Sequence, residues 1–310
     1  MSHSAAKTSI TAGGITVELS HTDKMFFPDD KITKGDLIEY YASVADRMLP
    51  YLKDRPVTMA RYPDGITGHR IFQKNVPGYF PDWITRAPVK KEGGELHQVI
   101  CDKPATLIYL ANQACVEPHV FLSRIDRLDH PDQLVIDFDP PDGQHFEQAR
   151  RGALWLKELL TDDLGATPFV KTTGGRGLHV HIPLDRAADF DEGREFALAL
   201  SAVLADRHPD DLTTEQRKQG RDGRVYLDAM RNSYAQLVVA PYAVRARPGA
   251  AVATPLHWAE VDDPALDPAA FNLRTTAARL DSTDDPWTGL NRHRYSLAKL
   301  AERLGQMKAG

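Results

Sequence analysis

The sequence predicts a mixed α/β (α+β) fold. Short apolar runs that end at proline, glycine or aspartate are typical of strands, and they alternate with stretches whose apolar residues recur at helical spacing. With 310 residues the chain is long enough for one large domain or two smaller ones. Its apolar share of 42% and charged share of 26% are those of a globular protein, and no apolar run is long enough to span a membrane.

Cysteine content and charge narrow the class further. Cys101 and Cys115 are too few for a disulfide framework or a zinc pattern, and we expect buried thiols in a reducing compartment. No signal peptide is recognisable, so we expect a cytoplasmic protein. The net charge of −5 argues against nucleic-acid binding by the surface as a whole, but Arg and Lys are frequent in residues 61–91 and 217–247, which leaves room for a local basic groove.

The N-terminal third predicts both strands and helices. Residues 1–14 are small and polar, so we expect a disordered tail, followed by a strand over 15–19. Thr33 with Asp36 is typical of a helix N-terminus, and apolar residues at helical spacing continue to Pro50, where we expect the helix to end. Further strands are predicted over 57–62 and 71–75, and a helix over 105–112.

Phe72 lies in one of these strands, between Arg70 and Lys74. An aromatic ring flanked by cations can serve as a platform on which a nucleic-acid base stacks. The same pattern fits a hairpin side chain that packs on the core, and the residues alone leave both interpretations open.

Residues 133–141 form the most informative stretch, an apolar run with two aspartates that two prolines terminate. In a strand, Asp137 and Asp139 point to the same face because they are two residues apart. Adjacent carboxylates repel each other, and a divalent cation between them is the simplest way to stabilise the pair. The alternative is a strand end at which both aspartates meet solvent.

Residues 169–183 predict a strand, a glycine-rich turn and a second strand, with His179 and His181 on one face. A glycine-rich turn exposes backbone N–H groups, which suits phosphate oxygens. A hydroxyl, a positive charge and a histidine donor accompany them. The alternative is a glycine hairpin with two surface histidines. The residues of this predicted phosphate site are Thr173, Gly174, Gly175, Arg176, Gly177 and His179.

The C-terminal half adds a third carboxylate and two arginines. A strand over 224–228 ends at Asp228, and Arg245 and Arg247 would share one face if extended. The polar, basic residues 213–223 are expected to form a mobile loop. Helices are predicted over 149–160, 192–206 and 296–304. Three strand-end aspartates with cationic side chains are what two-metal phosphoryl transfer needs, with Mg²⁺ or Mn²⁺ as the ion.

The motifs Val135–Pro140, Lys171–His179 and Ala240–Gly249 together resemble the polymerase module of bacterial ligase D, a member of the archaeo-eukaryotic primase superfamily. The resemblance runs from about residue 15 to about residue 304. It implies a primase-polymerase fold with an RRM-like, mixed or antiparallel catalytic sheet flanked by helices. An N-terminal subdomain over 15–125 would pack on a catalytic core over 126–305.

The resemblance also implies an activity, a nucleotidyltransferase that extends primers on a template at double-strand breaks and gaps and prefers ribonucleotides. Asp137 and Asp139 would bind two Mn²⁺ or Mg²⁺ ions, and Asp228 would complete the site of the ion that activates the primer 3′-hydroxyl. DNA, NTP or dNTP, a Ku-type end binder and a separate ligase are the implied partners. We expect the protein to associate with the bacterial nucleoid when it acts on DNA.

The remaining roles follow from the same resemblance. His119 would lie near the incoming sugar, and Phe72 would stack on a base. The nucleotide phosphates would be held by the glycine-rich turn with Arg245 and Arg247. The predicted pocket for a DNA 5′-phosphate consists of His21, Lys24 and Lys34. Other predicted DNA contacts are Arg61, Lys74 and Arg231.

Three positions depart from the family pattern, and two other functions stay open. Thr173 and Arg176 replace a usual serine and lysine, Ile71 replaces an aromatic residue, and His21 replaces a frequent asparagine. No ligase or nuclease module is recognisable, and a stand-alone polymerase is expected ahead of an excised domain. The alternatives are a catalytically idle module that binds DNA ends or 5′-phosphates, and a metal-dependent glycosyltransferase that uses the Asp-x-Asp pair.

Overall fold

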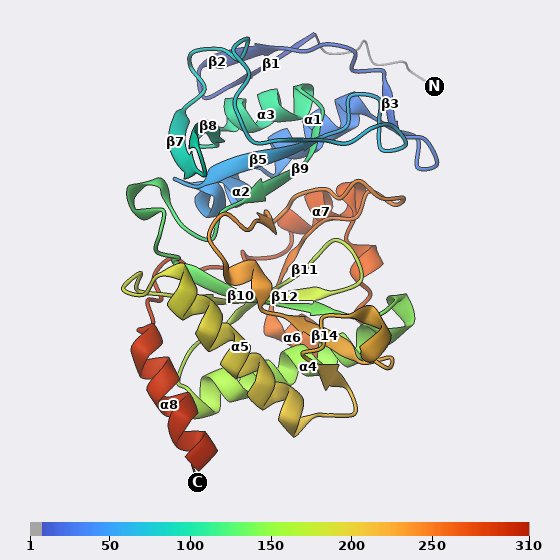
Figure 1. Ribbon diagram of the computed structural model, residues 1–310. Helices are drawn as coiled ribbons and strands as arrows, with labels where there is room; N and C mark the ends of the chain where they lie inside the picture. The colour runs from blue at the N-terminus through green and yellow to red at the C-terminus, as the bar shows by residue number, and fades with distance from the viewer. Residues whose placement is uncertain (1–7, 310) are drawn as a thin grey trace. The chain divides into compact units, whose positions relative to one another are not determined.

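The computed structural model describes residues 8–309, with side chains to residue 307, and it divides into two compact units (Figure 1). The first unit contains the chain up to Phe121, Val239–Ala253 and Ala269–Asp284. The second contains Leu122–Val238, Thr254–Pro268 and the chain from Asp285 onward. Within the described residues, no helix has the length and apolarity that crossing a bilayer requires.

The first unit is built on a sheet with strand order β15-β9-β5-β8-β7, and β6 pairs with β5. The pairs that β5 forms with β6, β8 and β9 are antiparallel, and α1 packs against α3. The strands are β1 Ser9–Ala12, β2 Ile15–Glu18, β3 Met25–Phe27, β4 Ile32–Thr33, β5 Pro56–Arg61, β6 Ile71–Gln73, β7 Arg86–Lys91, β8 Gly94–Ile100, β9 Cys115–Val120 and β15 Val238–Val239. The helices are α1 Lys34–Ser43, α2 Ala45–Leu52, α3 Pro104–Asn112 and α7 Leu273–Leu280.

Helix α1 begins where the sequence predicts. The Thr33 hydroxyl accepts the Asp36 N–H at 3.1 Å, and the Asp36 carboxylate accepts the Thr33 N–H at 2.7 Å. The prediction that the helix ends at Pro50 is wrong, because the chain breaks at Val44 and Pro50 lies inside α2. Proline there forgoes one helical hydrogen bond, while buried Met48 and its neighbours keep α2 packed on the core.

The prediction of a disordered tail is wrong in part. Residues 1–7 lie outside the described residues, but Ser9–Ala12 form β1, which pairs antiparallel with β2. Gly13 and Gly14, with φ of 58° and 78°, make the tight turn between them. This hairpin could not be predicted from the sequence, because its strand shows little alternation of apolar and polar residues. The two glycines of its turn add to the small, polar composition that is also typical of a disordered tail.

The second unit is built on a sheet with strand order β13-β14-β10-β12-β11-β16. β10 is antiparallel to both of its neighbours, β12 and β14. The strands are β10 Gln133–Asp139, β11 Phe169–Thr172, β12 Leu178–Pro183, β13 Leu212–Thr213, β14 Val225–Asp228 and β16 Pro255–Leu256. The helices are α4 Phe146–Glu158, which continues as a π-helical turn over Leu159–Asp163, α5 Phe190–Arg207, α6 Trp258–Asp262 and α8 Leu297–Ala309.

Helices α4 and α5 both contact β10 and lie on the same side of this sheet (Figure 1). A Cβ atom on Gly152 of α4 would come within 2.9 Å of the Phe138 ring, so the missing side chain lets the helix approach the sheet. Leu134 and Phe138 are fully buried on this helix-covered face. Asp137 and Asp139 alternate with them and therefore point to the opposite face.

The segment 213–223 is a loop, as predicted, after Thr213 at the end of β13, and it includes a 3₁₀ turn over Lys218–Gly220. β13 pairs parallel with β14. Arg245 and Arg247 do not lie on one extended segment, because the chain turns between them and the Arg247 N–H donates to the Arg245 carbonyl at 2.8 Å. The following Pro-Gly pair, with Gly249 at φ 85°, favours this turn over a strand.

Candidate active site

Three aspartates meet on the helix-free face of the second unit's sheet. In the antiparallel register, Asp137 on β10 lies directly opposite Asp228 on β14 and opposite His179 on β12. Directly opposed side chains project to the same face with Cβ atoms about 5 Å apart. Asp139 joins them because it is two residues beyond Asp137 on the same strand. The structure therefore brings the three predicted carboxylates to one face.

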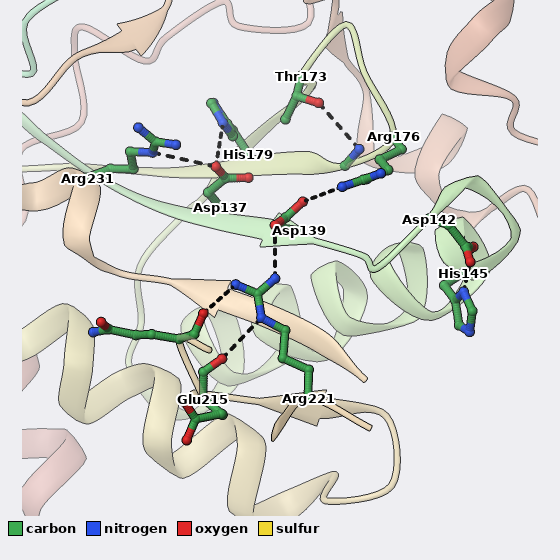
Figure 2. Close-up of polar contacts among 12 residues, drawn as sticks. Asp137, Asp139, Asp142, His145, Thr173, Arg176, His179, Glu215, Arg221 and Arg231 are labelled. Atoms are coloured by element: carbon green, nitrogen blue, oxygen red, sulfur yellow. Dashed lines mark hydrogen bonds and ion pairs between the residues drawn. The ribbon is translucent and has the colours of Figure 1, made fainter. Parts of the chain in front are cut away.

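Arginine and histidine side chains counter the first two carboxylates. The Asp137 carboxylate lies 3.4 Å from His179 Nε2 and 3.8 Å from Arg231 Nε, as Figure 2 shows. Arg231 Nε also lies 3.4 Å from the Asp228 carboxylate, which accepts the Met230 N–H at 2.8 Å. Arg231 thus bridges the two opposed aspartates. We predicted it as a DNA contact, and its side chain is 43% exposed.

Asp139 faces two further arginines (Figure 2). Arg176 of the glycine-rich turn lies 3.8 Å away, and Arg221 lies 3.1 Å away. Arg221 is buried, and its guanidinium lies 4.2 Å from the centroid of the Tyr226 ring and donates to the Gln216 carbonyl. The sequence did not single out Arg221, because it is one of several cations in a segment without periodicity.

Three carboxylates and three guanidiniums meet at this site. Burial raises the pKa of Asp228, Arg231 opposes that shift, and the carboxylates of Asp137 and Asp139 add to it. Among residues 8–309, no three His, Cys, Asp or Glu side chains stand close enough together to hold a metal ion in this arrangement. Each carboxylate is instead turned toward an arginine. The donor set still fits a divalent cation, because carboxylate oxygens on one face are the ligands that Mg²⁺ prefers.

The glycine-rich turn between β11 and β12 is closed from within. The Thr173 N–H donates to the Gly177 carbonyl at 3.0 Å, and the Gly177 N–H donates to the Thr173 hydroxyl at 3.3 Å. Gly174 has a φ of 63°, and a Cβ atom on Gly177 would come within 2.2 Å of the Phe138 carbonyl oxygen. Both glycines are therefore required by the backbone. Gly175 lies between Gly174 and Arg176 in the same turn.

Two neighbours of this site differ from expectation. His179 and His181 share a face and both are buried, so neither is a surface histidine of the hairpin alternative. His181 Nδ1 lies 2.7 Å from the Gln133 side chain, and its ring lies against Trp287. Lys171 on β11 is fully buried directly opposite His179. Lys171 has no predicted role, because composition does not indicate that a lysine is buried.

In the first unit, Phe72 is 43% exposed, so the interpretation that it packs on the core is wrong. Arg70 lies over the Phe72 ring at 5.7 Å, and the ring makes an edge contact with His119 at 5.6 Å between centroids. Arg245 Nε lies 3.2 Å from the carboxylate of Glu117 on β9, and His119 Nε2 lies 3.2 Å from the same carboxylate. Arg247 is exposed in the adjoining turn.

The three residues predicted to bind a 5′-phosphate lie together in the same unit. The Lys34 N–H donates to the Lys24 carbonyl at 2.8 Å, and the Lys24 N–H donates to the His21 carbonyl at 3.1 Å. The Lys34 ammonium is buried against Ser20, and Lys24 pairs with Asp64 at 2.7 Å. Burial, with the positive charges of Lys24 and Arg61, lowers the pKa of Lys34 to about 8. Asp64 therefore compensates Lys24, whereas the Lys34 ammonium donates to the neutral oxygens of Ser20.

Arg61 and Lys74 are two further predicted DNA contacts of the first unit, and their side chains differ in exposure. Arg61 Nε donates to the Gln113 carbonyl at 2.6 Å, and its guanidinium also donates to Gln73 and Tyr79. Lys74 is exposed just beyond β6. Arg61 is thus fixed by neighbours, whereas Lys74 projects from the strand end.

Comparison with solved structures defines the fold as that of a primase-polymerase domain. The polymerase domain of Mycobacterium tuberculosis ligase D, solved in complex with DNA, superposes with a TM-score of 0.84 and 31% sequence identity. The match covers 90% of this chain and 99% of that domain.

The family model described as LigD, primase-polymerase domain, matches residues 33–287, and the chain belongs to this family. The bifunctional non-homologous end joining protein LigD of Bacillus subtilis is 35% identical over 272 residues, which are 87% of this chain and 43% of that protein. The multifunctional LigD of Pseudomonas aeruginosa is 33% identical over 306 residues, 97% of this chain and 36% of that protein. The chain therefore spans less than half the length of these two relatives.

Proposed function

We propose that this protein is a template-dependent nucleotidyltransferase that adds nucleotides, with a preference for ribonucleotides, to primer ends at DNA gaps and double-strand breaks. The observation that carries the proposal is the meeting of Asp137, Asp139 and Asp228 on one sheet face, beside a phosphate-type glycine turn. Membership of the LigD primase-polymerase family supports it. A module that only binds DNA ends would not need three mutually repelling carboxylates.

The three aspartates are the proposed holders of two divalent cations, Mn²⁺ or Mg²⁺. When bound, such cations stabilise the negative charge that develops during phosphoryl transfer and favour ionisation of the attacking hydroxyl. Arg231 and Arg221, which face these carboxylates in the structure, would have to give way to them. Both arginines would then supply positive charge to DNA or nucleotide phosphates.

The chain's own residues orient the nucleotide. In this proposal the N–H groups of the glycine-rich turn and the charge of Arg176 bind the triphosphate, and the Thr173 hydroxyl, which already accepts the Gly177 N–H, donates its proton to a phosphate oxygen. His179, held beside Asp137, donates a further hydrogen bond. Phosphates bound in this way would be kept close to the carboxylates.

The first unit contains further residues that we propose contact the substrate. His119 would contact the sugar, the exposed ring of Phe72 would stack on a base, and Arg245 and Arg247 would bind nucleotide phosphates. The cluster of His21, Lys24 and Lys34 would bind the 5′-phosphate at the far side of a gap. The positive charges of Lys24 and Arg61 close to the buried Lys34 ammonium support an anionic ligand.

The proposed setting is non-homologous end joining or gap repair, because the relatives' names describe end joining. A Ku-type end binder and a separate DNA ligase are the proposed partners, and the bacterial cytoplasm, at the nucleoid, is the proposed location. The solved relative is in complex with DNA, which supports a DNA substrate.

Primer extension on gapped duplexes tests this function. We expect single-nucleotide addition in Mn²⁺, faster with ribonucleotides than with deoxyribonucleotides, and faster when the downstream strand carries a 5′-phosphate. Tight binding of the 5′-phosphorylated end without any addition would favour the binding module instead. Equal addition of both sugars would remove the ribonucleotide preference from the proposal.

A further inference from the structure

Glu117 is a buried carboxylate in the middle of β9, with a side chain only 5% exposed. Three donors surround it. His119 Nε2 lies 3.2 Å from one oxygen, and Arg245 Nε and the Ala246 N–H lie 3.2 Å and 2.7 Å from the other. One side chain thus connects β9 to the segment that contains Arg245.

These donors keep Glu117 ionised at neutral pH. Burial by itself would raise the pKa of Glu117, but the hydrogen bonds from His119 and Ala246 and the charge of Arg245 outweigh it and lower the pKa to about 2. An ionised carboxylate only accepts hydrogen bonds, so the atom of His119 that faces it must carry a proton. Neutral His119 is therefore the Nε2–H tautomer, with Nδ1 as its acceptor nitrogen.

We propose that Glu117 is a positioning residue for nucleotide selection, which fixes the tautomer of His119 and the orientation of the Arg245 guanidinium. The inference rests on the proposed function, in which His119 meets the sugar and Arg245 meets phosphate. A hydroxyl of the sugar then donates a hydrogen bond to Nδ1. A deoxyribonucleotide has fewer hydroxyls that could make this hydrogen bond. Phe72, in edge contact with the His119 ring, limits the other orientations of the imidazole.

A purely structural role for Glu117 is separable from this one. Tyr41 already ties the same two segments, because its hydroxyl donates to the Val116 carbonyl at 2.7 Å and accepts the Val244 N–H at 3.1 Å. Both of these hydrogen bonds are to backbone groups. Tyr41→Phe is therefore a matched control that loosens the two segments without altering the tautomer.

The first experiment measures the tautomer and does not depend on activity. In the wild-type protein labelled with ¹⁵N-histidine, NMR should show His119 as the Nε2–H tautomer at neutral pH. Glu117→Gln, whose amide can donate to Nε2, should shift His119 toward the Nδ1–H tautomer, and Tyr41→Phe should not. A wild-type His119 in the Nδ1–H form would overturn the inference, even if nucleotide addition is observed.

The second experiment is steady-state nucleotide addition by the same three proteins. Glu117→Gln should raise the KM for a ribonucleotide about tenfold with a smaller change in kcat, and it should lower the ratio of ribonucleotide to deoxyribonucleotide addition. Tyr41→Phe should leave that ratio unchanged, and Glu117→Asp should restore part of it. An unchanged ratio in folded Glu117→Gln, or an equal loss in Tyr41→Phe, would overturn the inference. An inactive wild-type protein with the expected tautomer would count against the proposed function alone.

Discussion

At Asp137 the side chain meets a second aspartate on one neighbouring strand and a histidine on the other. Such a row is unfavourable unless positive charge is supplied, and Arg231 supplies it from within the chain. The arginine counterions stabilise the fold without a bound cation. In this arrangement Asp139 is the most exposed of the three side chains, at 37%, against 14% for Asp137 and 17% for Asp228.

Replacement of Asp228 by asparagine should stabilise the protein when divalent cations are removed. Burial raises the pKa of Asp228 above its ordinary value, so the native state binds this proton more tightly than the unfolded state does. Above the raised pKa the ionised Asp228 carboxylate therefore destabilises the native state. This destabilisation is lost as the pH falls below the raised pKa. We expect Asp228→Asn to raise the Tm at neutral pH in a chelator, with a gain that vanishes near about pH 4.

The control is Asp222→Asn, because the Asp222 side chain is 77% exposed. The Tm of this variant should equal that of the wild-type protein. Thermal unfolding followed by circular dichroism at several pH values makes the measurement. A lower Tm in Asp228→Asn at neutral pH would mean that the carboxylate is stabilising and that our account of its environment is incorrect.

The lowered pKa of Lys34 predicts that recognition of the 5′-phosphate weakens as the pH rises. This pKa is lowered to about 8 by burial and by the charges of Lys24 and Arg61, so the ammonium loses its proton as the pH rises through that value. The rate advantage that a 5′-phosphate gives on gapped duplexes should decline between about pH 7 and 9. Lys34→Ala should lower it about tenfold at neutral pH, and exposed Lys91→Ala should not. A constant advantage across this range would remove Lys34 from the phosphate pocket.

The three aspartates could be predicted from the sequence, because Asp139 and Asp228 end apolar strands and Asp137 shares a face with Asp139 by spacing alone. Arg221 and Lys171 could not. Arg221 reaches Asp139 only through the turn around Lys218–Gly220, and Lys171 gains its place through pairing of β11 with β12. Cross-strand pairs of this kind depend on register, which a single sequence does not specify.

The glycine-rich turn is the element whose backbone the site depends on most. A methyl group on Gly177 would come within 2.2 Å of the Phe138 carbonyl oxygen, so Gly177→Ala must displace the turn from β10. We expect a higher KM for nucleotides and a loss of stability of about 1–3 kcal/mol, measured by urea unfolding. Gly143→Ala in the same unit is the control, because nothing lies within 4 Å of its added Cβ. Equal KM values for the two variants would argue against a phosphate role for the turn.

Elements with a recognisable cap, apolar strand or glycine turn could be predicted from the sequence, and elements without these features could not. The cap of α1, strand β10 and the β11–turn–β12 hairpin lie where the sequence predicts them. The β7–β8 hairpin is not evident from the sequence, because three consecutive charged residues, Lys90 to Glu92, interrupt its apolar alternation. Its turn is made by Gly93 and Gly94, both at positive φ.

At the scale of the whole molecule, each unit is assembled from separate segments of the chain. Val239–Ala253 and Ala269–Asp284 return to the first unit after the second has begun. The contacts that bring them back include the Tyr40 hydroxyl, which donates to the Tyr242 carbonyl at 2.8 Å, and the Gly249 N–H, which donates to Asp30 at 2.7 Å. Residues some 200 positions apart give no local signal, so the sequence predicted a single boundary.

DNA affinity should fall steeply with salt although the net charge is −5. If the five predicted basic contacts all meet phosphates, log Kd should change with log salt with a slope of magnitude roughly 4 to 5. Lys74→Ala should reduce that slope by about 1. A flat salt response in fluorescence anisotropy would show that binding does not depend on backbone phosphates. These contacts are Lys24, Lys34, Arg61, Lys74 and Arg231.

The most direct test of the central claim is single-nucleotide addition to a gapped, 5′-phosphorylated duplex by the wild-type protein and by Asp137→Asn, each with Mn²⁺ and with a chelator. We predict addition by the wild-type protein in Mn²⁺ only, and a loss of about 10³-fold or more in Asp137→Asn with DNA binding retained. Addition by the wild-type protein in the chelator, or wild-type rates from Asp137→Asn, would contradict a cation site built on these carboxylates.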